Sequence, residues 1–149
     1  MSNIAGDLAY WDGDGHVIED IDGIVKMLPK PFRDRISLTQ LVPPLDHHHS
    51  AIVVDVPEGA FQPVGPQGWA DFMVQGGFEQ AILYPTWFLA VGKYVEEPIA
   101  RAATRAYNDW LHEQYTGPFP QMNGAGLIPM MDVGYAVEEM HRCVEDLGF

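Results

Sequence analysis

The 149-residue sequence has few basic side chains. Eight lysines and arginines stand against 21 aspartates and glutamates, so the formal net charge is −13. A nucleic-acid-binding protein needs a basic surface to neutralise phosphates, and an anionic membrane surface repels a chain of this charge. We therefore expect neither a nucleic acid nor a membrane among its partners.

Cysteine and long hydrophobic runs are also scarce. Cys143 is the single cysteine, so no internal disulfide can form, which fits a reducing cytoplasm. The first ten residues contain no basic segment followed by an apolar run, and no apolar stretch approaches the ~20 residues that cross a bilayer. We expect a soluble, cytoplasmic protein without a signal peptide.

The composition that remains is typical of one globular domain. Hydrophobic residues make up 47% of the chain and charged residues 19%. A chain of this length buries roughly two thirds of the surface that its unfolded form exposes, so we treat residues 1–149 as one domain. The low charged fraction suggests that some apolar surface contacts a partner chain.

Hydrophobic periodicity predicts three pairs of strand and helix, with one further short helix before the second strand. The strands are expected at residues 7–12, 81–84 and 124–130, and the helices at 18–28, 68–77, 96–115 and 133–147. Prolines make residues 30–66 irregular, apart from a possible short strand at 51–56. The alternation predicts an α/β fold with parallel strands and right-handed crossovers. An open sheet of three such strands has exposed edges and is a poor free-standing domain.

The last predicted helix has a pronounced apolar stripe, and Asp132 is placed to cap its first turn. We expect this stripe, like those of the other helices, to cover a face of the sheet. Its members are Val133, Ala136, Val137, Met140, Val144 and Leu147.

The stretch DGDGHVIED, residues 12–20, holds five ionisable side chains. It could bind calcium, hold a transition metal, or cap a helix. The calcium reading fails, because a loop beginning at Asp12 has Val17 where the turn needs glycine and Gly23 where a bidentate glutamate is needed. A loop shifted so that a glycine falls at the turn also fails, because its first and last ligand positions then hold no carboxylate.

Asp14 and His16 fit a transition-metal site better than the stretch fits a calcium loop. Residues two apart on an extended chain point to the same side, about 6.5 to 7 Å apart at the backbone, close enough to share one ion. The ends of parallel strands are also where α/β folds place their sites. The alternative is that Asp14 is a turn acceptor and His16 a core histidine. Spacing leaves both readings open, since two ligands do not close a site.

Several motifs, in order along nearly the whole chain, resemble the N-terminal part of the amidohydrolase-related family of metal-dependent hydrolases and decarboxylases. They are DGDGHVIED, PPLDHHH, GW, AILYPTWFLAVG, ARAATRAYNDWLHEQY, GLIPMMD and AVEEMHRCVEDLGF. The resemblance implies the first three βα units of a (β/α)8 TIM-type barrel, with a long irregular loop after the first unit. It also implies a first strand that ends in a two-ligand motif, commonly His-x-His.

In this sequence, the two metal ligands that the resemblance implies are Asp14 and His16. The metal is then a divalent ion such as zinc, iron or manganese, and the harder metals tolerate an aspartate in place of the commoner histidine. The family's later histidines and its late aspartate have no counterpart before Phe149. We therefore expect a second protein chain, or a homologous barrel subunit, to complete the site.

Five further residues are predicted to contact a small-molecule substrate. Tyr84, Thr86 and Trp87 follow the second strand, at the end where barrels place their sites, although aromatic packing under a loop is the alternative. His47 and His49 lie in the long loop, which would border the catalytic mouth. An exposed polar loop is the commoner explanation for such histidines.

The leading hypothesis is an N-terminal chain or subunit of an amidohydrolase-type enzyme. Such an enzyme hydrolyses or decarboxylates a small carboxylate or amide-type substrate, and the catalytic base is not identified in this sequence. The alternative is a non-catalytic structural or regulatory subunit docked on a complete homologous barrel. A truncated copy of such an enzyme is the third possibility.

Overall fold

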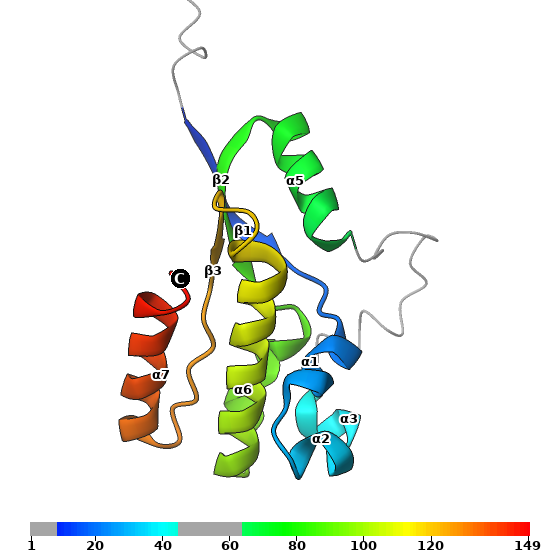
Figure 1. The fold of residues 1–149 in the computed structure, drawn as a ribbon, viewed down its shortest axis with the longest axis vertical. Helices are drawn as coiled ribbons and strands as arrows, with labels where there is room; N and C mark the ends of the chain where they lie inside the picture. The colour runs from blue at the N-terminus through cyan, green and yellow to red at the C-terminus, as the bar shows by residue number, and fades with distance from the viewer. Residues whose placement is uncertain (1–8, 45–63) are drawn as a thin grey trace, which may run out of the picture.

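The computed structural model describes residues 9–44 and 64–149 (Figure 1). Its strands β1 (Tyr10–His16), β2 (Phe78–Tyr84) and β3 (Met122–Gly124) form a parallel sheet in the order β1-β2-β3. The helices are α1 (Ile21–Met27), α2 (Phe32–Arg35), α3 (Leu38–Leu41), α5 (Gly65–Gly76), α6 (Glu97–Leu111) and α7 (Val133–Glu145). A 3-10 helix η2 (Trp87–Lys93) and a π-helical turn η3 (His112–Thr116) flank α6. The predicted α/β alternation with parallel strands is confirmed.

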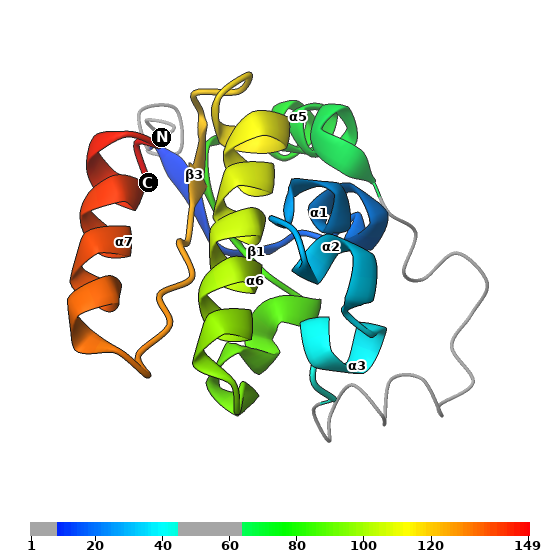
Figure 2. The same ribbon diagram turned by 60° about the horizontal axis from the view of Figure 1, so that its bottom comes forward.

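Helix α6 covers one face of the sheet (Figures 1 and 2). Its apolar residues recur at spacings of three and four, and Pro98 occupies its first turn, where a missing N–H costs nothing. The buried side of α6 contributes Tyr107 and Trp110 to the core, which also takes Leu83 from β2 and Met122 from β3. Helix α1 packs beside α6 over the same side of the molecule (Figure 2).

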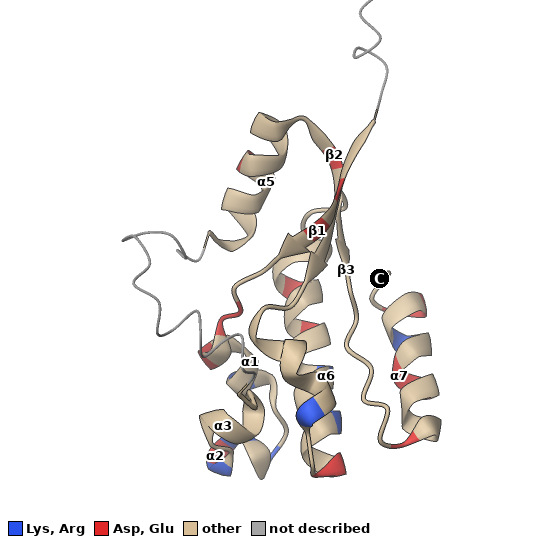
Figure 3. Cartoon of the chain, turned by 180° about the vertical axis from the view of Figure 1, so that it is seen from behind, with Lys and Arg blue, Asp and Glu red and all other residues tan. Residues whose placement is uncertain are grey.

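The opposite face of the sheet, turned to the viewer in Figure 3, is not covered by any helix of the described residues. Side chains alternate between the faces of a strand, so Ile82 and Tyr84 point to this open face while Leu83 points to the core. Asn123 lies there too, and its amide donates to Gln80 Oε1 at 2.9 Å. The open face therefore mixes polar and apolar groups.

Strand β1 differs from its prediction in its burial and at its C-terminal end. It was expected to be buried and to end at Asp12, but it continues through the acidic stretch to His16 and is mostly exposed, with Trp11 62% accessible. Irregularities in its pairing with β2, between Asp12 and Gly15 among others, accommodate this polar segment. The acidic stretch up to His16 is thus part of a strand that, among the described residues, pairs with β2 alone, and Asp20 at its far end caps α1.

The segment after α1 is helical where irregular chain was predicted. Helices α2 and α3 occupy part of residues 30–44, and Ser37 begins α3 with a capping box that it forms with Gln40. The prolines flank this pair of short helices, with Pro29 and Pro31 before α2 and Pro43 and Pro44 after α3, so none falls inside a helix, where it would remove a hydrogen bond. The predicted strand at 51–56 lies outside the described residues.

The third strand lies earlier than predicted. Strand β3 is Met122–Gly124, whereas 124–130 was expected. The backbone N–H of Ala125 still donates to Leu83 O, but the N–H and C=O of Leu127 both pair with the side chain of Asn108 on α6. The strand cannot continue there, because these two backbone groups bond to Asn108 and are not available to pair with a neighbouring strand.

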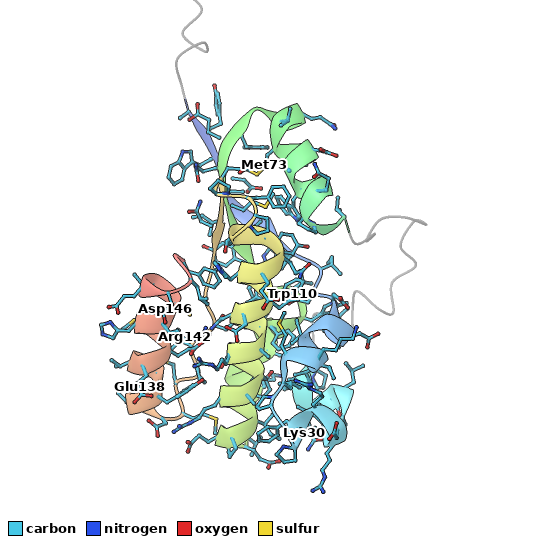
Figure 4. The ribbon with its side chains drawn as sticks, in the orientation of Figure 1. Lys30, Met73, Trp110, Glu138, Arg142 and Asp146 are labelled. Atoms are coloured by element: carbon cyan, nitrogen blue, oxygen red, sulfur yellow. The ribbon has the colours of Figure 1, made fainter. Side chains whose placement is uncertain are left out.

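Helix α7 is rotated about its axis relative to its prediction, although Ala136 of the predicted stripe is buried as expected. Its apolar stripe was expected to pack on the sheet, but Val133, Val137, Met140 and Val144 are exposed. The buried side carries Ala136, Glu139 and Cys143. A polar network explains the rotation: Arg142, which lies between α7 and α6 in Figure 4, donates to Glu139 on its own helix and to Asp109 on α6.

No helix in residues 9–44 and 64–149 is long and apolar enough to cross a membrane.

Candidate metal-binding site at the end of the first strand

The structure brings Asp14 and His16 together at the end of β1. Asp14 Oδ1 lies 3.7 Å from His16 Nε2, with both side chains on the same side of the strand, as their spacing predicted. The side chain of Asp14 is 93% accessible and that of His16 is 38% accessible. The pair therefore faces open space rather than the core.

The other ring nitrogen of His16 fixes its tautomer. Nδ1 lies 2.7 Å from the backbone oxygen of Pro85, which can only accept, so Nδ1 carries the hydrogen and donates it. In the neutral ring Nε2 then has a free lone pair, on the nitrogen that lies 3.7 Å from Asp14 Oδ1. Histidines that bind metals through Nε2 commonly donate their Nδ1–H to a carbonyl or carboxylate in this way.

These two atoms fit a shared divalent ion. A tetrahedral zinc ion held at roughly 2.1 Å by each atom would place them about 3.4 Å apart, close to the observed separation. The donor set of one imidazole and one carboxylate suits zinc, iron and manganese. A closed site needs at least one more protein ligand, and no group of three or more histidine, cysteine, aspartate or glutamate side chains converges within the described residues.

Gly15 lets the strand that carries the two ligands pack closely against its neighbours. A Cβ at this position would lie 2.9 Å from Trp69 Cη2, 3.0 Å from the backbone oxygen of Ile82 and 3.2 Å from Leu83 Cδ2. Contacts of this kind force either the strand or the neighbouring backbone to move. Glycine is therefore required here by packing.

Replacing Gly15 by alanine should lower the free energy of unfolding by about 1–3 kcal/mol, because the added methyl group overpacks this contact. Chemical denaturation followed by tryptophan fluorescence measures the loss. Gly13→Ala is the matched control, since a Cβ on Gly13 meets nothing within 4 Å. Equal losses for the two variants would show that the close approach at Gly15 has no energetic importance.

Glu19 is a functional candidate that sequence reasoning missed. It is only 5% accessible, and its carboxylate accepts three backbone N–H groups, from Thr86 and Phe88 at Oε1 and from Trp87 at Oε2, at 3.0–3.1 Å. Burial raises the pKa of this carboxyl, and the backbone hydrogen bonds oppose that rise. The sequence shows Glu19 only as one acid among several, because its partners lie almost 70 residues away.

The predicted substrate residues after β2 lie next to this pair. Tyr84 ends the strand, and its ring centroid lies 5.9 Å from that of His16. Thr86 and Trp87 follow in the segment that Glu19 holds, with Trp87 beginning η2. Their contact with a substrate stays a prediction. His47 and His49 lie outside the described residues, and their role stays a prediction as well.

A cleft of about 600 Å³ lies elsewhere, between the segment after β1 and the ends of α5 and α6. Its lining includes the carboxylates of Asp20 and Asp22 and the rings of Trp110 and Tyr115. None of the residues predicted to bind metal or substrate belongs to this lining. Glu19 does line it, so the cleft adjoins the buried carboxylate but not the metal pair itself.

Asp132 has the capping role that the sequence predicted, and Cys143 is a buried thiol. Asp132 caps α7, since its Oδ1 accepts from the N–H of Tyr135 at 2.9 Å, and it pairs with Arg101 at 2.7 Å. Cys143 is buried, and burial raises the pKa of its thiol to about 11. A thiol with this pKa is not a nucleophile at neutral pH.

Comparison with known proteins gives a match of fold and none of sequence. No family model and no curated protein matches the chain. Among solved structures, it matches the crystal structure of an amidohydrolase from Mycobacterium avium subsp. paratuberculosis K-10, with a TM-score of 0.67 and 19% identity. The fold is amidohydrolase-like. The match covers 95% of this chain and 48% of the other, so the chain spans about half the length of that amidohydrolase.

Proposed function

We propose that this chain is part of a metal-dependent enzyme of amidohydrolase type, in which Asp14 and His16 hold a divalent ion. The observation that carries the proposal is the approach of Asp14 Oδ1 to His16 Nε2, with Nδ1 already donating to Pro85. The amidohydrolase-like fold supports it, because the pair lies at the C-terminal end of a parallel strand, where such folds carry their sites.

The reaction that fits is hydrolysis or decarboxylation of a small carboxylate or amide-type substrate. A divalent ion bound by this pair supplies a Lewis acid that activates water or polarises a substrate oxygen. His16 contributes its Nε2 lone pair and Asp14 its carboxylate. Tyr84, Thr86 and Trp87 adjoin the pair and are the groups of this chain that would orient the substrate.

The remaining ligands come, in this proposal, from a second polypeptide that completes a barrel. Two surfaces support such a partner. In the described residues β1 and β3 each pair with one neighbour only, so both have an open edge. Helix α7, which lies on the β3 side of the molecule (Figure 1), carries the exposed stripe of Val137, Met140 and Val144, which a further helix of a barrel would cover.

A non-catalytic subunit is the second candidate. The 93% accessibility of Asp14 favours it, because a working metal ligand is normally held by neighbours. In this case the chain docks on a complete homologous barrel and binds no ion of its own. A measurement of whether Asp14 and His16 bind a metal ion therefore distinguishes the two candidate functions.

The purified chain, titrated with zinc, manganese and iron(II) by calorimetry, should bind one ion at the pair. Asp14→Ala and His16→Ala should each weaken binding at least tenfold, since either change leaves a single ligand. His141→Ala is the matched control, because His141 is exposed on α7 and pairs with Glu145 there. The same titration of His47→Ala and His49→Ala tests whether either loop histidine contributes.

If Asp14→Ala and His16→Ala bind metal as the unchanged chain does, the enzymatic proposal fails and the non-catalytic subunit is favoured. Repeating the titration after the chain is mixed with a candidate partner measures the ligands that the partner adds. An increase in affinity that disappears in His16→Ala would support a site shared between the two polypeptides.

A further inference from the structure

One peptide group connects His16 to Glu19. The peptide bond between Pro85 and Thr86 has its C=O and its N–H on opposite sides. The C=O accepts from His16 Nδ1 at 2.7 Å, and the N–H donates to Glu19 Oε1 at 3.0 Å. The buried carboxylate and the imidazole are thus joined through a single polarisable unit.

Glu19 is held firmly at its end of this connection. Besides the bond to Thr86, its carboxylate accepts the N–H groups of Trp87 and Phe88, so three successive peptide groups point at it. An ionised carboxylate is an acceptor only and matches three donors, and hydrogen bonds to a charged acceptor are about twice as strong as neutral ones. The segment that carries the Pro85 carbonyl is therefore fixed relative to β1.

The negative charge also changes the carbonyl itself. A charge at the N–H end of a peptide group polarises it, so the oxygen at the other end becomes a stronger acceptor. The Pro85 oxygen then retains the hydrogen on His16 Nδ1 more firmly. This is the carboxylate and histidine arrangement of metal sites, with a peptide group between the two side chains.

A second carboxylate acts on His16 in the opposite sense. Asp14 Oδ1, 3.7 Å from Nε2, attracts a hydrogen to that nitrogen. The two tautomers of the neutral ring therefore compete, Nδ1–H favoured by the connection to Glu19 and Nε2–H by Asp14. Only the first leaves Nε2 free to bind a metal ion.

We propose that Glu19 is a positioning residue that fixes the Nδ1–H tautomer of His16 through the Pro85–Thr86 peptide group and so keeps Nε2 available as a ligand. The change between tautomers is neutral overall: Nδ1 releases one proton to solvent and Nε2 takes one up. The availability of Nε2 matters because of the proposed metal function, but the tautomer itself stands on the geometry alone.

The test is nitrogen-15 NMR of the chain labelled at its six histidines, at pH 8.5, well above the ordinary histidine pKa of roughly 6.5. Comparison with His16→Ala assigns the His16 signals. The unchanged chain should show Nδ1–H as the main tautomer. In Glu19→Gln the ratio of Nδ1–H to Nε2–H should fall about tenfold, because the charge on the connection is lost and Asp14 remains.

Three further variants separate charge from structure. Glu79→Gln makes the same change at an exposed position of β2 and should leave the ratio as it was. Glu19→Asp keeps the charge but withdraws it by one methylene group, and should give an intermediate ratio. Adding Asp14→Asn to Glu19→Gln should move the ratio back towards Nδ1–H, which a role of Glu19 in folding alone does not predict.

An Nε2–H majority in the unchanged chain would overturn the proposal even if Glu19→Gln does not fold. An unaltered ratio in a folded Glu19→Gln would overturn it as well. Zinc titration of the same samples should show binding weakened about tenfold in Glu19→Gln. If Glu19→Gln shifts the tautomer ratio but none of the samples binds zinc, the proposed metal function fails while the positioning role of Glu19 stands.

Discussion

Replacing Asn108 by alanine should lower the free energy of unfolding by about 3–5 kcal/mol, because several buried groups lose their partners together. Asn108 is fully buried on α6. Its Oδ1 accepts from the N–H of Leu127 at 2.8 Å, and its Nδ2 donates to the Leu127 oxygen and to Glu139 Oε1 at 2.9–3.0 Å. Alanine leaves both backbone groups of Leu127 without their partner, in the segment between β3 and α7.

Urea denaturation followed by circular dichroism measures this loss. Asn123→Ala is the matched control, since Asn123 is half-buried at the open face and donates to Gln80 and Ala81. Its loss should stay near 1 kcal/mol, the usual value for one hydrogen bond that water can replace. Losses of equal size at the two positions would contradict the view that Asn108 anchors α7 to α6.

Replacing Glu139 by glutamine should cost about 3 kcal/mol at pH 7, because a buried charge pair loses one partner. The carboxylate of Glu139 accepts from Arg142 Nη2 at 2.6 Å and Nε at 2.9 Å, and from Asn108 at 2.9 Å. A glutamine amide keeps one acceptor and turns a donor towards the guanidinium. Arg142, only 13% accessible at its side chain, then retains Asp109 as its main partner.

The cost at Glu139 should depend on pH in a defined direction. Burial raises the pKa of this carboxyl, but the hydrogen bonds from Arg142 and Asn108 and the charges of Arg142 and Arg105 outweigh burial and leave the pKa below its ordinary value of 4.5. A lowered pKa in the folded state means that the stabilisation is present above pH 4.5 and is lost as the pH falls through the folded value.

The difference in stability between the unchanged chain and Glu139→Gln should therefore shrink below pH 4.5. Unfolding measured at pH 7, 5, 4 and 3 tests this. Glu138→Gln is the matched control, because Glu138 is the exposed neighbour on the same helix. A difference that stays constant from pH 7 to pH 3 would show that the charge of Glu139 contributes nothing.

Local pattern was sufficient for the parts of the fold that depend on periodicity. Helix α6 follows from apolar residues at spacings of three and four, with Pro98 in its first turn. Strand β2 follows from a short apolar run before Pro85. The approach of Asp14 to His16 follows from their spacing of two on an extended chain, and so it was predictable before the fold was known.

Other features depend on contacts that no local pattern records. The burial of Glu19 rests on N–H groups 67 to 69 residues away, so its sequence neighbours could not distinguish it from the exposed acids around it. Most of the apolar stripe of α7 was wrongly predicted to be buried, for a related reason. Its apolar stripe is the stronger local signal, but the hydrogen bonds and ion pairs of Glu139 and Arg142 with α6 decide which side is buried.

The sequence by itself determined the α/β alternation, the exclusion of a calcium loop, and two candidate ligands on one side of a strand. These depend on side-chain spacing along the chain, which is a local quantity. Only the tertiary structure decided that the first part of DGDGHVIED, up to His16, belongs to a strand, that Gly15 lies too close to β2 to carry a side chain, and that Glu19 reaches His16 through the Pro85–Thr86 peptide. Each of these requires two distant segments to meet, and their meeting is settled by packing and hydrogen bonding of the whole chain.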